Sequence, residues 1–121
     1  MDQELSCDLN RKFRELFNAA VDEAMLMLGE SGRQATYYHI EKVLGLERGR
    51  WHNTVEEFAE AVEQIFGPGA QLLLKAITKE LYSDLGLKFH EPKKINFARL
   101  VREAEHYFLT RAGAGGGEFF D

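Results

Sequence analysis

The sequence predicts an all-α protein, a single-domain bundle of about five helices. Apolar residues recur at spacings of three and four through most of the 121 residues, and no stretch alternates as a half-buried strand would. Glycines, prolines and capping residues divide this pattern into separate helices. The content of 45% hydrophobic and 29% charged residues is ordinary for a soluble globular domain. We expect one helical domain over residues 1–111 and a disordered glycine-rich tail over 112–121.

The first two predicted helices lie on either side of Gly29. A long amphipathic stripe runs from Leu5 to Leu28 and indicates a helix that ends near this glycine. Ser31, with Gln34 three residues later, forms a capping box that would open the second helix. Apolar residues surround most of the second helix, so we expect it to lie between neighbouring helices rather than on the outside.

The third and fourth predicted helices meet at a Gly-Pro-Gly turn over residues 67–69. Thr54, with Glu57, is a second capping box, and the helix that it opens separates apolar residues from a glutamate face. The fourth helix carries a stripe of large aliphatic residues and ends at Gly86, where glycine can adopt the left-handed conformation. We expect this helix to form the core; its stripe consists of Leu73, Leu74, Ile77, Leu81 and Leu85.

A short connector over residues 88–95 precedes the last predicted helix, for which Asn96 is the expected cap. The glycine-rich tail that follows ends with Phe119 and Phe120. This pair is either a short docking motif or a remnant of an expression tag.

Charge and cysteine content exclude several classes of protein. The net charge of −5 argues against a protein whose main task is to bind nucleic acid, because that task depends on neutralising phosphates. Cys7 is the only cysteine, so an intrachain disulfide is impossible. No apolar run approaches the roughly 20 residues that cross a bilayer, and the amino terminus lacks a secretion signal. We therefore expect a cytoplasmic protein that does not contact a membrane.

Two stretches of the chain resemble a known family. GESGRQATYYHIEKVLGL and, after a spacer, FAEAVEQIFGPGAQLLLKAITKELYSDLGLKF resemble the archaeal Nitrosopumilus output domains. The likeness extends from about Gly29 to Phe89 and consists of core and turn residues. The resemblance implies a small helical module associated with archaeal signal transduction, and it supplies no catalytic residues.

Motifs for catalysis or metal binding are missing from the sequence. No two histidines have the spacing of a metal site on a helix, and no nucleophile-elbow or phosphate-binding glycine motif occurs. Glu56, Glu60 and Glu63 lie on the side of their helix away from the core, as a solvated charged face would. We therefore predict no enzyme activity, no catalytic residues, no metal and no cofactor.

The densest set of residues that could recognise a partner or ligand lies in the second helix and the loop after it. Aromatic and arginine side chains are the usual anchors of binding surfaces. For the two tyrosines, core packing is the competing interpretation, and Trp51 could instead fold over helix ends as a lid. The tentative site consists of Arg33, Tyr37, Tyr38, His39, Arg48, Arg50 and Trp51.

Three functional hypotheses follow. The leading one is a non-enzymatic signalling module that acts through protein–protein contacts as a homodimer, because the apolar residues exceed what a monomer could cover. The second is a small-molecule sensor with a pocket near Tyr37, Tyr38, His39 and Trp51. The third and least favoured is a DNA-binding regulator, since the Gly-Pro-Gly turn superficially resembles a helix-turn-helix but follows a row of glutamates.

Overall fold

The computed structural model describes the backbone of residues 2–113 and the side chains of residues 8–111. Within these residues it contains helices and turns and no strand, which confirms the predicted all-α class. The predicted disorder of the tail and the Phe119–Phe120 pair lie outside the described residues, while the last helix itself extends to Gly113. The α-helices are α1 (Asp2–Met25), α2 (Gly29–Tyr38), α3 (Val55–Phe66), α4 (Ala70–Asp84) and α5 (Phe97–Gly113).

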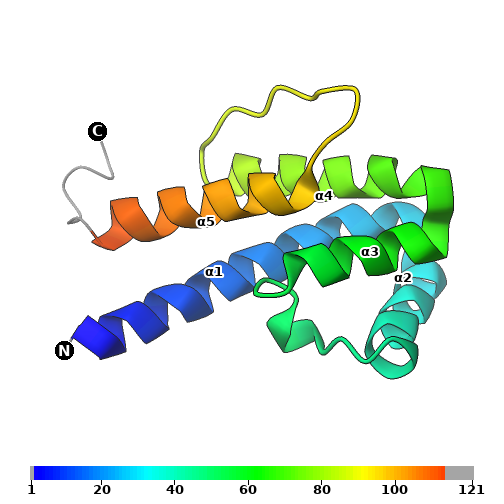
Figure 1. Cartoon of the computed structure of the whole chain (residues 1–121), viewed down its shortest axis with the longest axis horizontal. Helices are drawn as coiled ribbons and strands as arrows, with labels where there is room; N and C mark the ends of the chain where they lie inside the picture. Colours follow the sequence, from blue (N-terminus) through cyan, green and yellow to red (C-terminus); the bar gives the residue numbers. More distant parts are fainter. Residues whose placement is uncertain (1, 114–121) are drawn as a thin grey trace.

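The four longer helices form the bundle, and α2 projects from one end of it (Figure 1). Helix α1 lies along α4, which runs in the opposite direction, and α3 and α5 complete the packing (Figure 1). The aromatic rings of Phe17, Phe58 and Phe97 meet in the centre, with centroids 5.8–6.2 Å apart. Side chains from four helices thus share one core. The largest fully buried side chains include Trp51, Phe13, Phe17, Phe58, Met25, Ile40, Leu74, Ile77 and Leu81.

Helix α4 is the core helix that the sequence predicts. Four of its predicted stripe residues, Leu73, Leu74, Ile77 and Leu81, are buried. The helix ends at Asp84, Gly86 has a φ of +74°, and the backbone N–H of Leu87 donates to the carbonyl of Tyr82 at 2.8 Å. This is the glycine-dependent helix ending expected from the sequence.

The helix starts follow the capping predictions only in part. Asn96 caps α5, because its Oδ1 accepts a hydrogen bond from the backbone N–H of Arg99 at 3.2 Å. Thr54 precedes α3 as predicted, but its hydroxyl donates backward to the carbonyl of Arg50 instead of capping. The capping box at Ser31 is wrong, since α2 already begins at Gly29.

The expectation that the second helix lies between neighbours is also wrong. Helix α2 is on the outside of the molecule (Figure 1), and Thr36 is its only buried residue. Apolar residues on all sides of a helix allow it to be buried on all sides. Whether the helix is buried depends on how many neighbouring helices lie against it. Beyond α2 the chain continues as a π-helical turn over His39–Val43, in which the backbone N–H of Leu44 donates to the carbonyl of His39 at 3.0 Å. π-Helical turns are rare and often occur at functional sites.

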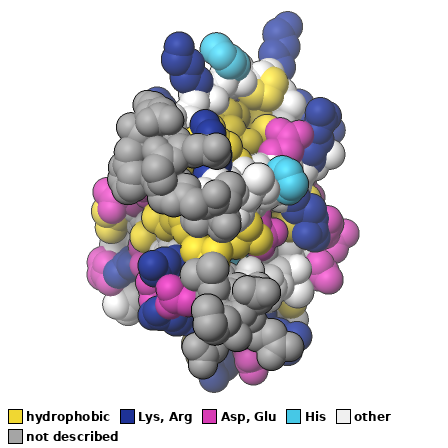
Figure 2. Space-filling view, turned by 90° about the vertical axis from the view of Figure 1, so that its left-hand side faces the viewer, with side chains coloured by type: hydrophobic (Ala, Val, Ile, Leu, Met, Phe, Trp, Pro, Cys, Tyr) yellow, Lys and Arg dark blue, Asp and Glu magenta, His cyan; other side chains and the backbone are white. Residues whose placement is uncertain are grey.

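The end of the bundle opposite α2 also presents apolar side chains. Figure 2 shows hydrophobic surface, bordered by acidic and basic side chains, at the end where α1 begins and α5 ends. A shallow hollow of about 350 Å³ lies between these two helices and is lined by Leu16, Ala19 and Phe108, with Lys12 and Glu15 at its edge. Phe13 and Phe108 pack across the two helices with ring centroids 6.0 Å apart. The hollow thus lies over a packed contact between α1 and α5.

Two leucines of α4 allow a matched test of this packing. Leu81 has no exposed surface, whereas Leu72 is 66% exposed. Leu81→Ala should lower the free energy of unfolding by about 2–5 kcal/mol because it opens a cavity in the core. Leu72→Ala should change that free energy by less than about 0.5 kcal/mol. Urea denaturation followed by circular dichroism measures both, and equal effects would contradict the assignment of the buried face.

Candidate protein-interaction site

A single carboxylate at the end of α1 holds the segment that projects from the bundle. Asp22 Oδ1 accepts a hydrogen bond from the hydroxyl of Tyr37 at 2.7 Å and lies 3.5 Å from Nη1 of Arg33. Asp22 Oδ2 lies 2.5 Å from Nη2 of Arg48. The three partners come from α2 and from the 3₁₀ turn at Arg48–Arg50. Asp22 therefore joins three segments that are distant in the sequence.

Two further carboxylates accept hydrogen bonds from these arginines. Nη2 of Arg33 also contacts both carboxylate oxygens of Glu30, at 2.5 and 2.7 Å. The backbone N–H of Arg48 donates to Oε2 of Glu41 at 3.2 Å. Since carboxylates already pair with both guanidinium groups, the cluster is not a ready site for an external anion.

The aromatic members of the cluster pack against the same arginines. The guanidinium of Arg48 lies 5.0 Å from the centre of the Tyr37 ring and 6.0 Å from that of Trp51. Cations at these distances are attracted to the faces of aromatic rings. The rings of Tyr37 and Trp51 meet edge to face at 5.4 Å. Burial, followed by the hydrogen bond to Asp22, raises the pKa of Tyr37 above its usual range, so the hydroxyl keeps its proton.

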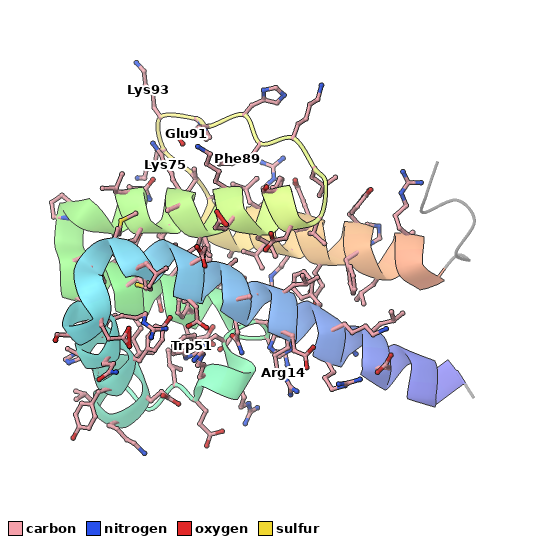
Figure 3. All side chains as sticks on the ribbon, turned by 180° about the vertical axis from the view of Figure 1, so that it is seen from behind. Arg14, Trp51, Lys75, Phe89, Glu91 and Lys93 are labelled. Atoms are coloured by element: carbon pink, nitrogen blue, oxygen red, sulfur yellow. The ribbon has the colours of Figure 1, made fainter. Side chains whose placement is uncertain are left out.

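Trp51 is a core residue. It has no exposed surface, its ring lies 4.9 Å from that of Phe58, and its Nε1–H donates to the carbonyl of Leu46 at 2.9 Å. Figure 3 shows the residue between α1 and the turn that follows α2. A tryptophan whose N–H is satisfied and whose faces are covered contributes to stability and presents no surface to a ligand.

The structure divides the seven residues of the tentative site into two groups. Arg33, Tyr37, Arg48 and Trp51 come together around Asp22, as the contacts above show. The other three, Tyr38, His39 and Arg50, lie apart from this cluster; Tyr38 is 65% exposed and Arg50 is exposed as well. The four side chains expected to line a small-molecule pocket therefore do not converge, because Trp51 is packed solid and Tyr38 faces solvent.

Asp22, the residue on which the cluster depends, is not among the site residues predicted from the sequence. Asp22 lies beside the apolar stripe of α1, next to Val21, at the boundary between buried and exposed faces. A carboxylate at such a boundary, in a chain with arginines elsewhere, is a weak signal of a buried ion pair. Nothing local identifies Arg33 or Arg48 as its partners, which lie 11 and 26 residues away.

Exposed apolar side chains concentrate on the segment that Asp22 holds. We call residues 26–43, which comprise the 3₁₀ turn at Leu26–Leu28, α2 and the π-helical turn, the arm. Among the described residues, five large hydrophobic side chains are exposed, and four belong to the arm: Leu26 (51%), Met27 (53%), Tyr38 (65%) and Val43 (60%). The fifth is Leu72 of α4. Exposed apolar side chains gathered on one segment typically mark an interaction surface.

Comparisons with protein-family models, with curated proteins and with solved structures found no match to this chain. Over the described residues, no helix combines the length and the apolar character needed to cross a membrane. In the same part of the chain, no three His, Cys, Asp or Glu side chains come close enough together to hold a metal ion.

A buried histidine lies next to this cluster in the chain. His52 is only 7% exposed and its Nδ1 has no hydrogen-bond partner, whereas His106 is exposed, as its helical position predicts. Burial, and to a lesser degree the positive charge of Arg14, lowers the pKa of His52 below its ordinary value. Figure 3 shows Arg14 on the side of α1 that faces the turn containing Trp51.

The depressed pKa of His52 makes stability depend on pH. As the pH falls below about 6.5, the unfolded chain binds a proton at this histidine before the folded chain does, so the free energy of unfolding decreases. His52→Gln should reduce this loss between about pH 7 and pH 5. Thermal unfolding at several pH values measures the effect. Parallel pH profiles for the wild type and His52→Gln would contradict the account.

The role of Asp22 can be tested with its neighbour as a control. Asp22→Asn removes the charge that Arg33 and Arg48 share, and it should cost about 1–2 kcal/mol of stability, since all three side chains are partly solvated. Glu23→Gln, at an exposed position, should cost less than about 0.5 kcal/mol. Amide hydrogen exchange should show faster opening of the arm in Asp22→Asn only. An arm as protected as in the wild type would overturn this role.

Proposed function

We propose that this chain is a non-enzymatic helical module that acts through protein–protein contacts and forms a homodimer through the arm. One observation carries the proposal: the arm holds four of the five large hydrophobic side chains that are exposed in the described residues. Two copies can cover these side chains by pairing about a two-fold axis, in which each arm contacts the other.

The construction of the arm supports this proposal. Tyr37 and Thr36 turn toward the bundle, and Tyr38 and Val43 turn away from it. The Asp22 cluster fixes the arm from the inside, so the exposed side chains are positioned before a partner arrives. Preorganisation of this kind lowers the entropy cost of association.

The resemblance to the archaeal output domains supports a place for this contact in signal transduction. Most of the arm belongs to the stretch that resembles the family, GESGRQATYYHIEKVLGL. Under this proposal, a change in the pairing of the arms conveys the signal. Nucleic acid is not the proposed partner, because Glu56, Glu60 and Glu63 are exposed along α3, directly before the Gly-Pro-Gly turn.

Light scattering coupled to size exclusion tests the homodimer directly. The wild type should elute with twice the mass of one chain, and the double variant Tyr38→Ser/Val43→Ser should dissociate at least about tenfold more readily. Both positions are solvent-exposed, so the variant should fold normally.

Leu72→Ser serves as the matched control, because it removes an equally exposed apolar side chain outside the arm. It should leave the dimer intact. A strictly monomeric wild type at high concentration would refute the homodimer, and equal weakening by both variants would refute the assignment to the arm.

A further inference from the structure

A groove runs along α3, on a part of the surface that the arm does not include. Its first hollow, of about 480 Å³, lies between α3, the start of α4 and residues 94–98. A second hollow of about 610 Å³ continues along α5 and shares Glu56, Asn96 and Ala98 with the first. Both hollows are open to solvent, so a segment of polypeptide can lie over them.

The wall opposite α3 is held in place by side chains of α4. Nζ of Lys75 donates to the carbonyl of Lys93 at 2.7 Å, and the backbone N–H of Ile95 donates to Oε1 of Gln71 at 3.0 Å. Figure 3 shows Lys75 reaching toward the connector, while Lys93 points away from the molecule. Ile95, the last residue of the connector, is buried. The groove is therefore formed before any occupant binds.

The charges in the first hollow are unbalanced. Glu56, Glu60 and Glu63 lie along the α3 wall at helical spacings of four and three, and Lys94 is the only cation in the lining. Glu56 pairs across the groove with Arg102 at 2.6 Å, which lowers the pKa of the Glu56 carboxyl. Glu60 and Glu63 form no ion pair with any side chain among residues 8–111. Two carboxylates thus border the groove without a compensating charge.

The floor between these walls is apolar. Ala59, Leu74, Ile95, Phe97 and Ala98 contribute to the lining of the first hollow. An occupant that matches the groove needs apolar side chains for the floor and cations for the α3 wall. Glu60 and Glu63 are three residues apart on one helix, so their side chains are neighbours and can face two cations spaced in the same way.

From this charge complementarity, we propose that the groove binds a basic amphipathic segment of a partner protein, with lysine or arginine side chains facing Glu60 and Glu63. The site is separate from the arm, so the chain would dimerise through one surface and capture its partner through another. A module with both surfaces could bring two copies of the same partner together.

A labelled peptide in which lysine and leucine follow helical spacing provides the probe, with a glutamate–leucine peptide of the same pattern for comparison. The lysine peptide should bind, more tightly at about 0.01 M than at about 0.15 M ionic strength, because its charges are partly exposed. The glutamate peptide should not bind. Fluorescence anisotropy of the labelled peptide, titrated with the full chain, reads out both.

The double variant Glu60→Gln/Glu63→Gln should weaken binding of the lysine peptide at least about fivefold. Glu23→Gln/Glu47→Gln removes the same net charge at exposed positions outside the groove lining and should change affinity much less. Equal losses in the two variants would overturn the proposal, because they would reflect overall charge rather than the groove.

Two further outcomes would also overturn it. Failure of the lysine peptide to bind at low ionic strength would exclude a basic segment as the occupant. A change in the mass of the free chain on Glu60→Gln/Glu63→Gln, without peptide binding, would identify a second copy as the occupant. Tyr38→Ser/Val43→Ser should retain peptide binding. The proposed homodimer and the proposed peptide site in the groove can therefore be refuted independently of each other.

Discussion

The position of the arm depends on the Asp22 carboxylate. The arm contributes little to the core, since only Thr36 and Ile40 within α2 and the π-helical turn are buried. Burial of Ile40 and the packing of Leu28 and Tyr37 against the core hold the arm at fewer points than the four longer helices are held. Hydrogen bonds and ion pairs from Asp22 to Tyr37, Arg33 and Arg48 add to this packing. Because each of these polar groups is partly buried, separating one from its partners is unfavourable, and the arm keeps one orientation.

The different interactions that hold the bundle and the arm connect the stability of the protein to its proposed function. Among the described side chains of the bundle, Leu72 is the only large apolar one that is exposed, and the apolar surface at the end opposite α2 is partly buried. No helix covers the outer side of the arm, so Leu26, Met27, Tyr38 and Val43 stay exposed, while Arg33 and Tyr37 face Asp22. The exposed apolar side chains of the arm are unfavourable in an isolated monomer, and association of two copies would cover them. The groove along α3 differs from the arm, because it would attract a partner mainly through the charges of its glutamates, whereas the arm would do so through apolar side chains.

The sequence reveals those features of the fold that depend on neighbouring residues. The α4 stripe, the stop at Gly86 and the cap at Asn96 could be predicted, because each is decided within one or two turns of helix. The exposure of α2 could not be predicted. Tyr37 and Tyr38 are adjacent in the sequence, and only the position of α1 decides which of the two side chains faces the bundle. The Asp22 cluster joins residues 15 and 26 positions apart, and no local pattern specifies such pairings.

The central claim is that the arm is a rigidly held apolar surface that a second copy covers. Amide hydrogen exchange of the arm, measured at low and high protein concentration, tests this most directly, because exchange reports burial residue by residue. Exchange across the arm should slow as the concentration rises, while the outer face of α5 exchanges at a constant rate. Arm amides whose exchange rate does not change over a concentration range in which the mass of the protein rises from that of one chain to that of two would contradict the claim.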